Sequence, residues 1–223
     1  MTKLKKYKMF INGEWTDSES KKTFQTLNPE NNEPWAEVPE ASEKDVDKAV
    51  KAAQKAFEGT WSKLFPKERA KYLKAIAEQL RENAEHLGKI ETIDTGKLFK
   101  ETKTQANYIA EYYDYYAGLA DKVEGTVLPI DKANMQVITT RVPIGVVAAI
   151  IPWNSQMLLT AVKLAPALAM GNTVVIKSSE LAPATLFELG KLIEKTGIPK
   201  GVVNIISGFG EPCGKALTSH NLV

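Results

Sequence analysis

Polar residues follow apolar runs at several points in the second half of the chain, and their types suit a binding or catalytic site. Asn154 ends the segment Pro152-Trp153-Asn154, and its side-chain amide can donate a hydrogen bond to an oxygen that gains negative charge during a reaction. The same side chain can instead cap a helix that begins after it. The residue type leaves both roles open.

Lys177 and Glu180 form a second group, because Lys177 ends a buried apolar run and Glu180 follows three residues later. A cation and a carboxylate at the solvent end of a strand can hold the hydroxyls of a ribose, and the carboxylate disfavours an added 2′-phosphate. A strand-end ion pair combined with helix capping explains the two residues equally well.

The segment from Gly208 to Gly214 invites comparison with the dinucleotide fingerprint G-x-G-x-x-G, but Cys213 stands where the last glycine belongs. The segment also follows the third apolar run rather than the first, as the fingerprint would. Its glycines still let backbone N–H groups and a helix N-terminus approach an anion. An ordinary tight turn accounts for them about as well.

Other reactive side chains indicate no further site. Cys213 is the single cysteine, and no base is placed by the sequence to activate it, so passive packing is favoured over nucleophilic attack. It cannot form an intramolecular disulfide, which fits a reducing compartment. His86 and His220 are isolated, without metal-ligand spacing, so we predict no metal.

The elements that must position these residues are buried strands. The runs 146–151, 173–177 and 202–206 lack polar alternation and are separated by expected helices at about 155–170, near Pro183 and after Gly210. This pattern predicts an α/β fold with a partial, Rossmann-like parallel sheet of about three βα units. Ligands bind beyond the carboxyl ends of such strands, so Asn154, Lys177 and Gly210 are expected at the rim of one nucleotide-sized hollow.

The first half predicts mainly helices. Ser42 can cap a helix that ends at Gly59, a second helix starts near Pro66, and a third spans 100–118. The tyrosines of the third helix are better explained by packing against a neighbour than by base stacking.

Two hairpins are expected. Asn12-Gly13 predicts a tight antiparallel turn between 8–11 and 14–16. The extended segments 125–130 and 135–142 predict a second, projecting hairpin, whose sheet edges need covering and which is therefore a candidate subunit contact. We divide the chain into a hairpin and helical part (1–122), the projecting hairpin (123–143) and the partial Rossmann-like region (144–223).

The composition excludes several classes of protein. Hydrophobic residues make up 43% of the chain and charged residues 25%, and the net charge of +2 comes from interspersed charges, which does not indicate a nucleic-acid partner. The most apolar run, 144–151, is far shorter than the ~20 residues of a membrane-spanning helix. No signal-peptide core follows the first lysines. A cytoplasmic protein is expected.

Taken together, the motifs closely resemble the aldehyde dehydrogenase superfamily. The resemblance rests on Ile150-Ile151-Pro152-Trp153-Asn154, Val175-Ile176-Lys177-Ser178-Ser179-Glu180, and the glycines Gly210 and Gly214. Flanking features match as well: Phe10-Ile11-Asn12-Gly13-Glu14-Trp15, Asn28-Pro29, Asp94-Thr95-Gly96-Lys97, Tyr116-Ala117-Gly118 and Val142-Pro143-Ile144-Gly145-Val146. The likeness covers nearly the whole chain.

The resemblance implies NAD- or NADP-dependent oxidation of an aldehyde to a carboxylic acid, in which a cysteine attacks the aldehyde and hydride passes to the nicotinamide. It gives Asn154 the role of oxyanion donor. It also implies that the adenosine ribose is held by Lys177, Ser179 and Glu180, that Gly210 and Gly214 lie on the phosphate side, and that Ile150, Ile151, Pro152 and Trp153 line the cofactor cleft. The segment 125–142 resembles the family's oligomerisation hairpin, so a homo-oligomer, a dimer or tetramer, is expected at full length.

Two local departures and one large one accompany the resemblance. Ser155-Gln156-Met157 replaces the usual aromatic and proline after the asparagine, which leaves the aldehyde open, and Ser178 replaces the usual proline after the lysine. The family's nucleophilic cysteine and its E-L-G-G glutamate correspond to positions beyond Val223. We therefore expect a cofactor-binding portion, inactive alone, with an unpaired sheet edge. The alternative is a non-catalytic module that binds nucleotide or oligomerises.

Overall fold

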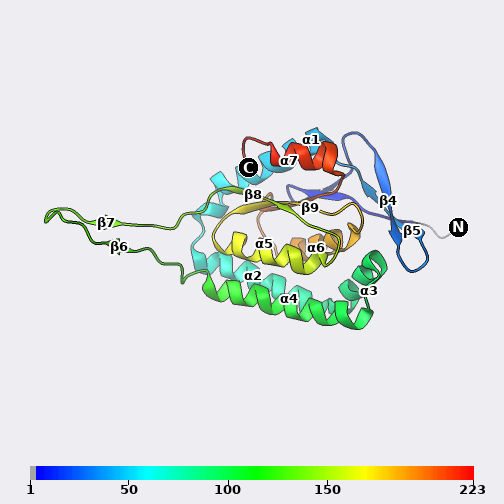
Figure 1. The fold of residues 1–223 in the computed structure, drawn as a ribbon, viewed down its shortest axis with the longest axis horizontal. Coiled ribbons are helices and arrows are strands. Elements are labelled where there is room, and N and C mark those ends of the chain that lie inside the picture. Colours follow the sequence, from blue (N-terminus) through cyan, green and yellow to red (C-terminus); the bar gives the residue numbers. More distant parts are fainter. Residues whose placement is uncertain (1–3) are drawn as a thin grey trace.

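A computed structural model describes residues 4–223, and a five-stranded sheet of order β3-β2-β10-β9-β8 lies at its centre (Figure 1). The strands β8 (Val146–Ile150), β9 (Thr173–Lys177) and β10 (Val203–Ile206) pair in parallel. Helices α5 (Gln156–Ala169) and α6 (Ala184–Lys195) connect them in turn. Every residue of β9 and β10 is buried, which explains their continuous apolar sequence and confirms the predicted Rossmann-like winding.

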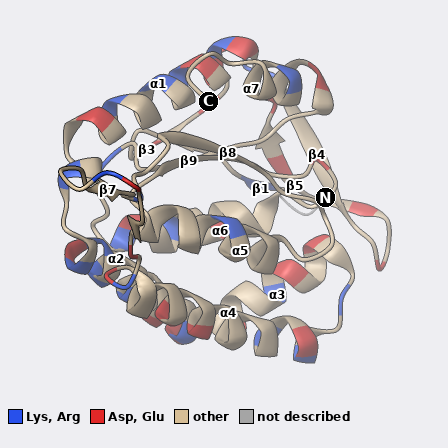
Figure 2. Cartoon of the chain, turned by 60° about the vertical axis from the view of Figure 1, so that its left-hand side comes forward, with Lys and Arg blue, Asp and Glu red and all other residues tan. Residues whose placement is uncertain are grey.

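Helices cover both faces of this sheet. On one face lie α5 and α6, with α2 (Pro66–Glu82) and α4 (Phe99–Leu119) beyond them; α1 (Glu43–Gly59) and α7 (Lys215–Thr218) cover the other face (Figure 1). In Figure 2 blue and red residues are mixed over the outer helices, while the strands between them are largely tan. The charges therefore form a solvated surface and do not gather on one face.

The opening hairpin is part of the central sheet. Its strands β2 (Met9–Ile11) and β3 (Glu14–Thr16) are joined by Asn12 and Gly13, whose φ angles of 55° and 72° are those of the expected turn. All of β2 is buried, and it pairs antiparallel with β10, opposite Ile205. The unpaired edge expected from the sequence therefore lies at β8: β2 covers the edge of β10, whereas β8 stands at the end of the sheet and pairs, within the described residues, with β9 alone.

The predicted helices form close to the expected limits. The Ser42 hydroxyl accepts from the backbone of Asp45, and the Asp45 carboxylate accepts from the backbone of Ser42 at 2.8 Å, so a reciprocal cap starts α1. Helix α4 extends one residue further at each end than the predicted 100–118. On it Tyr113 is fully buried, and the rings of Tyr112 and Tyr116 pack with centroids 5.0 Å apart.

Several elements were not predicted. A further helix, α3 (Ala84–Thr95), stands between α2 and α4, and β1 (Lys5–Lys6), β4 (Thr23–Asn28) and β5 (Glu33–Pro39) form a second, three-stranded sheet. The short helical turn η1 (Trp61–Lys63) was also not predicted, whereas η2 (Gly210–Gly214) and α7 form where a short helix was expected after Gly210. The second sheet and α3 both lie toward the end of the molecule where β4 and β5 are labelled in Figure 1.

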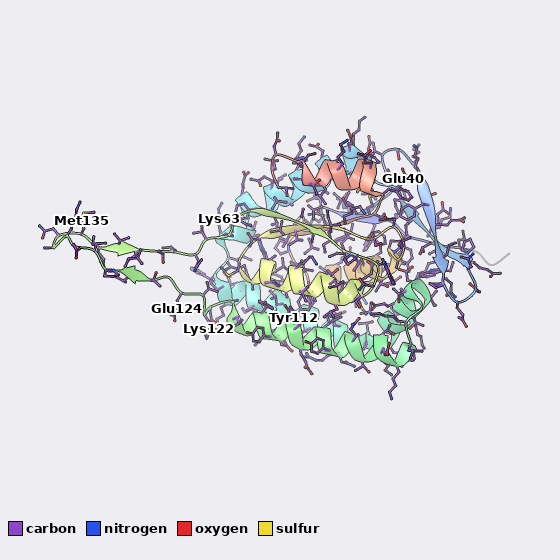
Figure 3. All side chains as sticks on the ribbon, viewed as in Figure 1. Glu40, Lys63, Tyr112, Lys122, Glu124 and Met135 are labelled. Atoms are coloured by element: carbon purple, nitrogen blue, oxygen red, sulfur yellow. The ribbon has the colours of Figure 1, made fainter. Side chains whose placement is uncertain are left out.

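The second hairpin projects from the opposite end of the molecule. Strands β6 (Val127–Leu128) and β7 (Val137–Ile138) pair antiparallel, with Lys122 and Glu124 near the base and Met135 near the tip (Figure 3). Most of its apolar side chains are exposed, including Val127 at 65% and Ile138 at 64%. Within residues 4–223 no helix has both the length and the apolar character to cross a membrane.

Candidate functional site

The carboxyl ends of the three parallel strands open on one hollow of about 570 Å³. Trp153 after β8, Glu180 after β9 and Phe209 after β10 all line it. Trp153 and Glu180 were singled out from the sequence, whereas Asn154, Lys177 and Gly210, which were expected at the rim, are not among the residues that line this hollow. The opposite wall comes from β4 and the end of α3: it includes Phe24, Thr26, Leu27, Asp94 and Thr95. The Phe24 and Phe209 rings meet across it with centroids 5.1 Å apart.

Asn154 lies exposed between β8 and α5. Helix α5 begins at Gln156, its N-cap residue is Ser155, and no side chain caps it. Asn154 thus does not cap α5, which was one of the two roles that its residue type left open. Its amide makes no hydrogen bond within the described chain, which leaves both amide N–H groups free for a ligand.

The residues before Asn154 differ in what they offer. Ile150 is 43% exposed and Trp153 is 50% exposed, so both present apolar surface at the strand end. The Ile151 side chain is only 1% exposed and belongs to the core. Ile151 therefore offers a ligand almost no accessible surface, whereas Pro152 is exposed.

Lys177 is buried at the end of β9, and its ammonium group is held on two sides. Nζ donates to the carbonyl oxygen of Ser178 at 3.1 Å and pairs with Glu180 Oε2 at 3.4 Å. The Glu180 side chain is 38% exposed, so its carboxylate faces both the lysine and solvent. The ion pair left open by the sequence exists, but Glu180 does not cap α6, which starts only at Ala184.

The serines between Lys177 and Glu180 fasten this loop. Ser178 donates from its backbone N–H to the Ile206 carbonyl at 2.9 Å, and its hydroxyl donates to the same oxygen at 3.3 Å. The Ser179 hydroxyl accepts from the backbone of Leu181 at 3.2 Å. The end of β9 is thereby tied to the end of β10.

The glycines after β10 serve different purposes. Gly208 has a φ of +152°, and a Cβ there would stand 2.8 Å from the Cys213 Cβ, so only glycine fits. A Cβ on Gly214 would lie 3.7 Å from Lys177 Cε, which places this glycine against the lysine. A Cβ on Gly210 would meet no other atom within 4 Å, so the backbone there is accessible to a ligand.

Cys213 is fully buried, as the passive interpretation required. Burial raises the pKa of its thiol to about 11, so the thiol is protonated at neutral pH and is a poor nucleophile. His86 pairs with Glu188 at 3.1 Å and His220 with Asp47 at 3.4 Å. Across residues 4–223, no His, Cys, Asp and Glu side chains gather in a group of three or more suited to a metal ion.

The sequence did not indicate that Asp94 holds β4 and the start of α6 beside the hollow. Its Oδ1 accepts from the Thr26 hydroxyl at 2.9 Å, and its Oδ2 accepts from the Ala184 N–H at 2.8 Å, so a residue of α3 caps α6. Burial raises the pKa of Asp94 to about 7, against the effect of these hydrogen bonds. The motif Asp94-Thr95-Gly96-Lys97 was the only signal in the sequence that pointed to it.

Residues 15–223 match the family model described as "Aldehyde dehydrogenase family". The chain belongs to this family. Among its relatives, a (Z)-2-((N-methylformamido)methylene)-5-hydroxybutyrolactone dehydrogenase of Acinetobacter baylyi is 50% identical over 97% of this chain and 44% of the relative's length. A betaine aldehyde dehydrogenase of Bacillus subtilis is 43% identical over 94% of this chain and 43% of its own length.

Solved aldehyde dehydrogenase structures share the fold. A betaine aldehyde dehydrogenase point mutant from Staphylococcus aureus in complex with NAD+ superposes with a TM-score of 0.93 at 38% identity, over 97% of this chain and 44% of that one. An NAD-dependent aldehyde dehydrogenase from Sinorhizobium meliloti gives a TM-score of 0.95 at 32% identity, over 99% and 44%. The chain thus spans less than half the length of these relatives.

Proposed function

We propose that this chain is the cofactor-binding portion of an enzyme that oxidises an aldehyde to a carboxylic acid with NAD. The observation that carries the proposal is the convergence of three strand ends on one hollow, whose lining includes Glu180, the ion-pair partner of Lys177. Sheets of this winding bind nucleotides at that place. The NAD+ bound to the similar Staphylococcus aureus enzyme supports the choice of cofactor.

The residues at the strand ends suit a dinucleotide. A lysine ammonium has three N–H donors, and the two contacts of Lys177 within the described chain leave one for a ribose hydroxyl. The half-exposed carboxylate of Glu180 can accept from a second hydroxyl, and the Ser179 hydroxyl lies in the same loop. Gly214 lies against the end of the Lys177 side chain, on the side proposed for the phosphates.

The remaining proposed contacts come from the other two strand ends. Gly210 offers one accessible backbone N–H for a phosphate. The exposed Ile150, Pro152 and Trp153 form the wall beside β8, and Ile151, buried in the core, supports it. We favour NAD over NADP because the Glu180 carboxylate opposes a 2′-phosphate. When bound, the cofactor supplies the hydride acceptor, and the chain's residues hold and orient it.

Asn154 is proposed to act on the substrate. Its exposed amide, free of hydrogen bonds within the described chain, can donate to the oxyanion that forms when a nucleophile adds to the aldehyde carbonyl. Cys213 is buried and protonated, so the nucleophile and the base belong elsewhere in the complete enzyme. The 223 residues alone are therefore expected to bind NAD without turnover.

Assembly is a separate part of the proposal. The exposed apolar residues of the hairpin 123–143 favour contact with another subunit, so we propose a homo-oligomer, a dimer or tetramer, in the complete enzyme. The proposed division of the chain separates the opening hairpin and helices (1–122), the projecting hairpin (123–143) and the partial Rossmann-like region that binds the cofactor (144–223).

A cytoplasmic location fits the one buried, unpaired cysteine. The same hairpin also favours the alternative, a non-catalytic module that binds nucleotide or oligomerises.

Two measurements test the proposed function. Isothermal titration of residues 1–223 with NAD+ should give saturable binding, and NAD+ reduction by the complete enzyme should depend on an added aldehyde. No binding to a folded chain would contradict the cofactor site. Binding in both proteins, with no reduction by the complete protein for any of a panel of aliphatic, aromatic and cationic aldehydes, would favour the non-catalytic alternative.

A further inference from the structure

The end of helix α3 touches both loops that carry the proposed site. Asp94 accepts from the backbone of Ala184 at the start of α6, as described above. Gly96 ends α3 in the left-handed conformation, with a φ of +76°, so that the chain reverses there. Immediately after this turn, the Lys97 ammonium donates to the Ser155 hydroxyl. One short segment thus reaches the loop after β8 and the loop after β9.

Ser155 has a backbone conformation that a non-glycine residue rarely adopts, with a φ of 158° and a ψ of 63°. Such a residue costs free energy and persists where its surroundings hold it in place. No side chain caps α5, so capping does not hold it. Among the described residues, the Ser155 hydroxyl has its hydrogen bond from Lys97, and Ser155 directly follows Asn154.

The first turn of α5 is fixed from the same side. The buried Gln156 side chain donates from Nε2 to the carbonyl oxygen of Ala182, in the loop that precedes α6. Glu91 lies fully buried near the backbone N–H of Gln156 and the charge of Lys97, and neither of its carboxyl oxygens has a hydrogen-bond partner in the described chain. The two strand-end loops are therefore linked to each other and to α3.

We propose that Lys97 is a positioning residue for the reaction. By holding Ser155, it fixes the loop 152–155 and with it the direction in which the Asn154 amide points. Asp94 sets the start of α6 in the same way, so the segment 91–97 keeps the two loops at a fixed spacing. The proposal rests on the proposed function of Asn154, because the amide must meet a developing oxyanion for its direction to matter.

The complete enzyme tests the proposal through the kinetics of Lys97→Met. A displacement of a reacting group by about 1 Å can cost ~100-fold in rate, so kcat should fall by about 10- to 100-fold. The KM for the aldehyde should stay within about twofold, and the affinity for NAD+ should fall much less than kcat, since Lys97 touches neither Lys177 nor Glu180 and acts on the cofactor wall only through Pro152 and Trp153. Lys97→Arg keeps a donor and should recover most of the loss. Lys100 is an exposed charged residue at the start of α4, so Lys100→Met is the matched control and should leave kcat, KM and the affinity for NAD+ unchanged.

A second substitution checks the route through Ser155. Ser155→Ala should lower kcat similarly, and adding Lys97→Met to it should cause little further loss, because both changes remove the same contact. Additive losses in the double variant would show that Lys97 acts elsewhere and would overturn the proposal.

Hydrogen exchange separates this proposal from the proposed function. Peptides covering 152–157 should exchange faster in Lys97→Met than in the wild type or Lys100→Met, with peptides of α2 unchanged. Unchanged exchange in 152–157 overturns the proposal, and so does faster exchange with an unaltered kcat in an enzyme that oxidises aldehydes. If the wild-type enzyme neither binds NAD+ nor oxidises aldehydes, the proposed function fails, and the exchange data alone decide whether Lys97 holds the loop.

Discussion

The substitution Glu180→Gln examines the proposed ribose contact with the smallest possible change in shape. It removes the negative charge that pairs with Lys177 at 3.4 Å and leaves a side chain of the same length. A hydrogen bond to a charged group contributes about 1.5–3 kcal/mol. Since the Glu180 side chain is 38% exposed, solvent screening favours the lower figure. The dissociation constant for NAD+ should therefore rise about tenfold.

The same substitution should affect NADP+ less. The carboxylate opposes a 2′-phosphate, so its removal offsets part of the lost contact, and the preference for NAD+ over NADP+ should shrink by several-fold. Isothermal titration of residues 1–223 with each nucleotide measures both effects. Glu78→Gln on α2 carries the same charge change at an exposed position and is the control. Equal weakening for both nucleotides, or no weakening in Glu180→Gln, would refute the assignment of Glu180.

Four further expectations follow from the described contacts. Gly208→Ala should lower the free energy of unfolding by about 1–3 kcal/mol in urea denaturation, because its Cβ would collide with Cys213 at a φ of +152°; a neutral result would show that the turn can shift. Cys213 should react with a thiol reagent at pH 8 only after unfolding, since burial raises its pKa to about 11, and rapid labelling of the native chain would argue against that burial. Burial raises the pKa of Glu91 from 4.5 to about 7, so its contribution to the free energy of unfolding is fully present below about pH 4.5 and is lost as the pH rises through 7. Glu91→Gln should therefore raise the free energy of unfolding by up to about 3 kcal/mol at pH 8 and by little at pH 4. Equal effects of the substitution at both pH values would contradict this. Replacing 126–139 by a short turn should reduce the mass of the complete enzyme in analytical ultracentrifugation, whereas an unchanged mass would place the subunit contact elsewhere.

The sequence predicts the central strands well because burial removes polar residues from them. β9 and β10 are buried along their whole length, so their apolar runs stand out and mark where the strand ends must be. The opening turn at Asn12 and Gly13 is similarly local in origin, since the two residue types themselves favour positive φ angles. The position of Lys177 and Glu180 at a strand end followed directly from these features.

Other parts depend on contacts that no local pattern contains. The pairing of β2 with β10 joins residues almost two hundred positions apart, so the hairpin was predicted but its place in the sheet was not. Helix α3 was missed because its buried face carries Glu91 and Asp94, which break the apolar periodicity. β4 has only one buried residue, Thr26, and so shows little alternation. Because α3 and β4 were not predicted, the sequence also did not indicate the wall of the hollow that faces the strand ends.

The most direct test of the central claim is hydrogen exchange of residues 1–223 with and without saturating NAD+. The account predicts that the cofactor slows exchange together in three separate segments, 150–155, 177–181 and 208–214, while the hairpin 123–143 is unaffected. Protection confined to one of the three segments, or located at the hairpin end of the molecule, would contradict a single cofactor site at the ends of β8, β9 and β10.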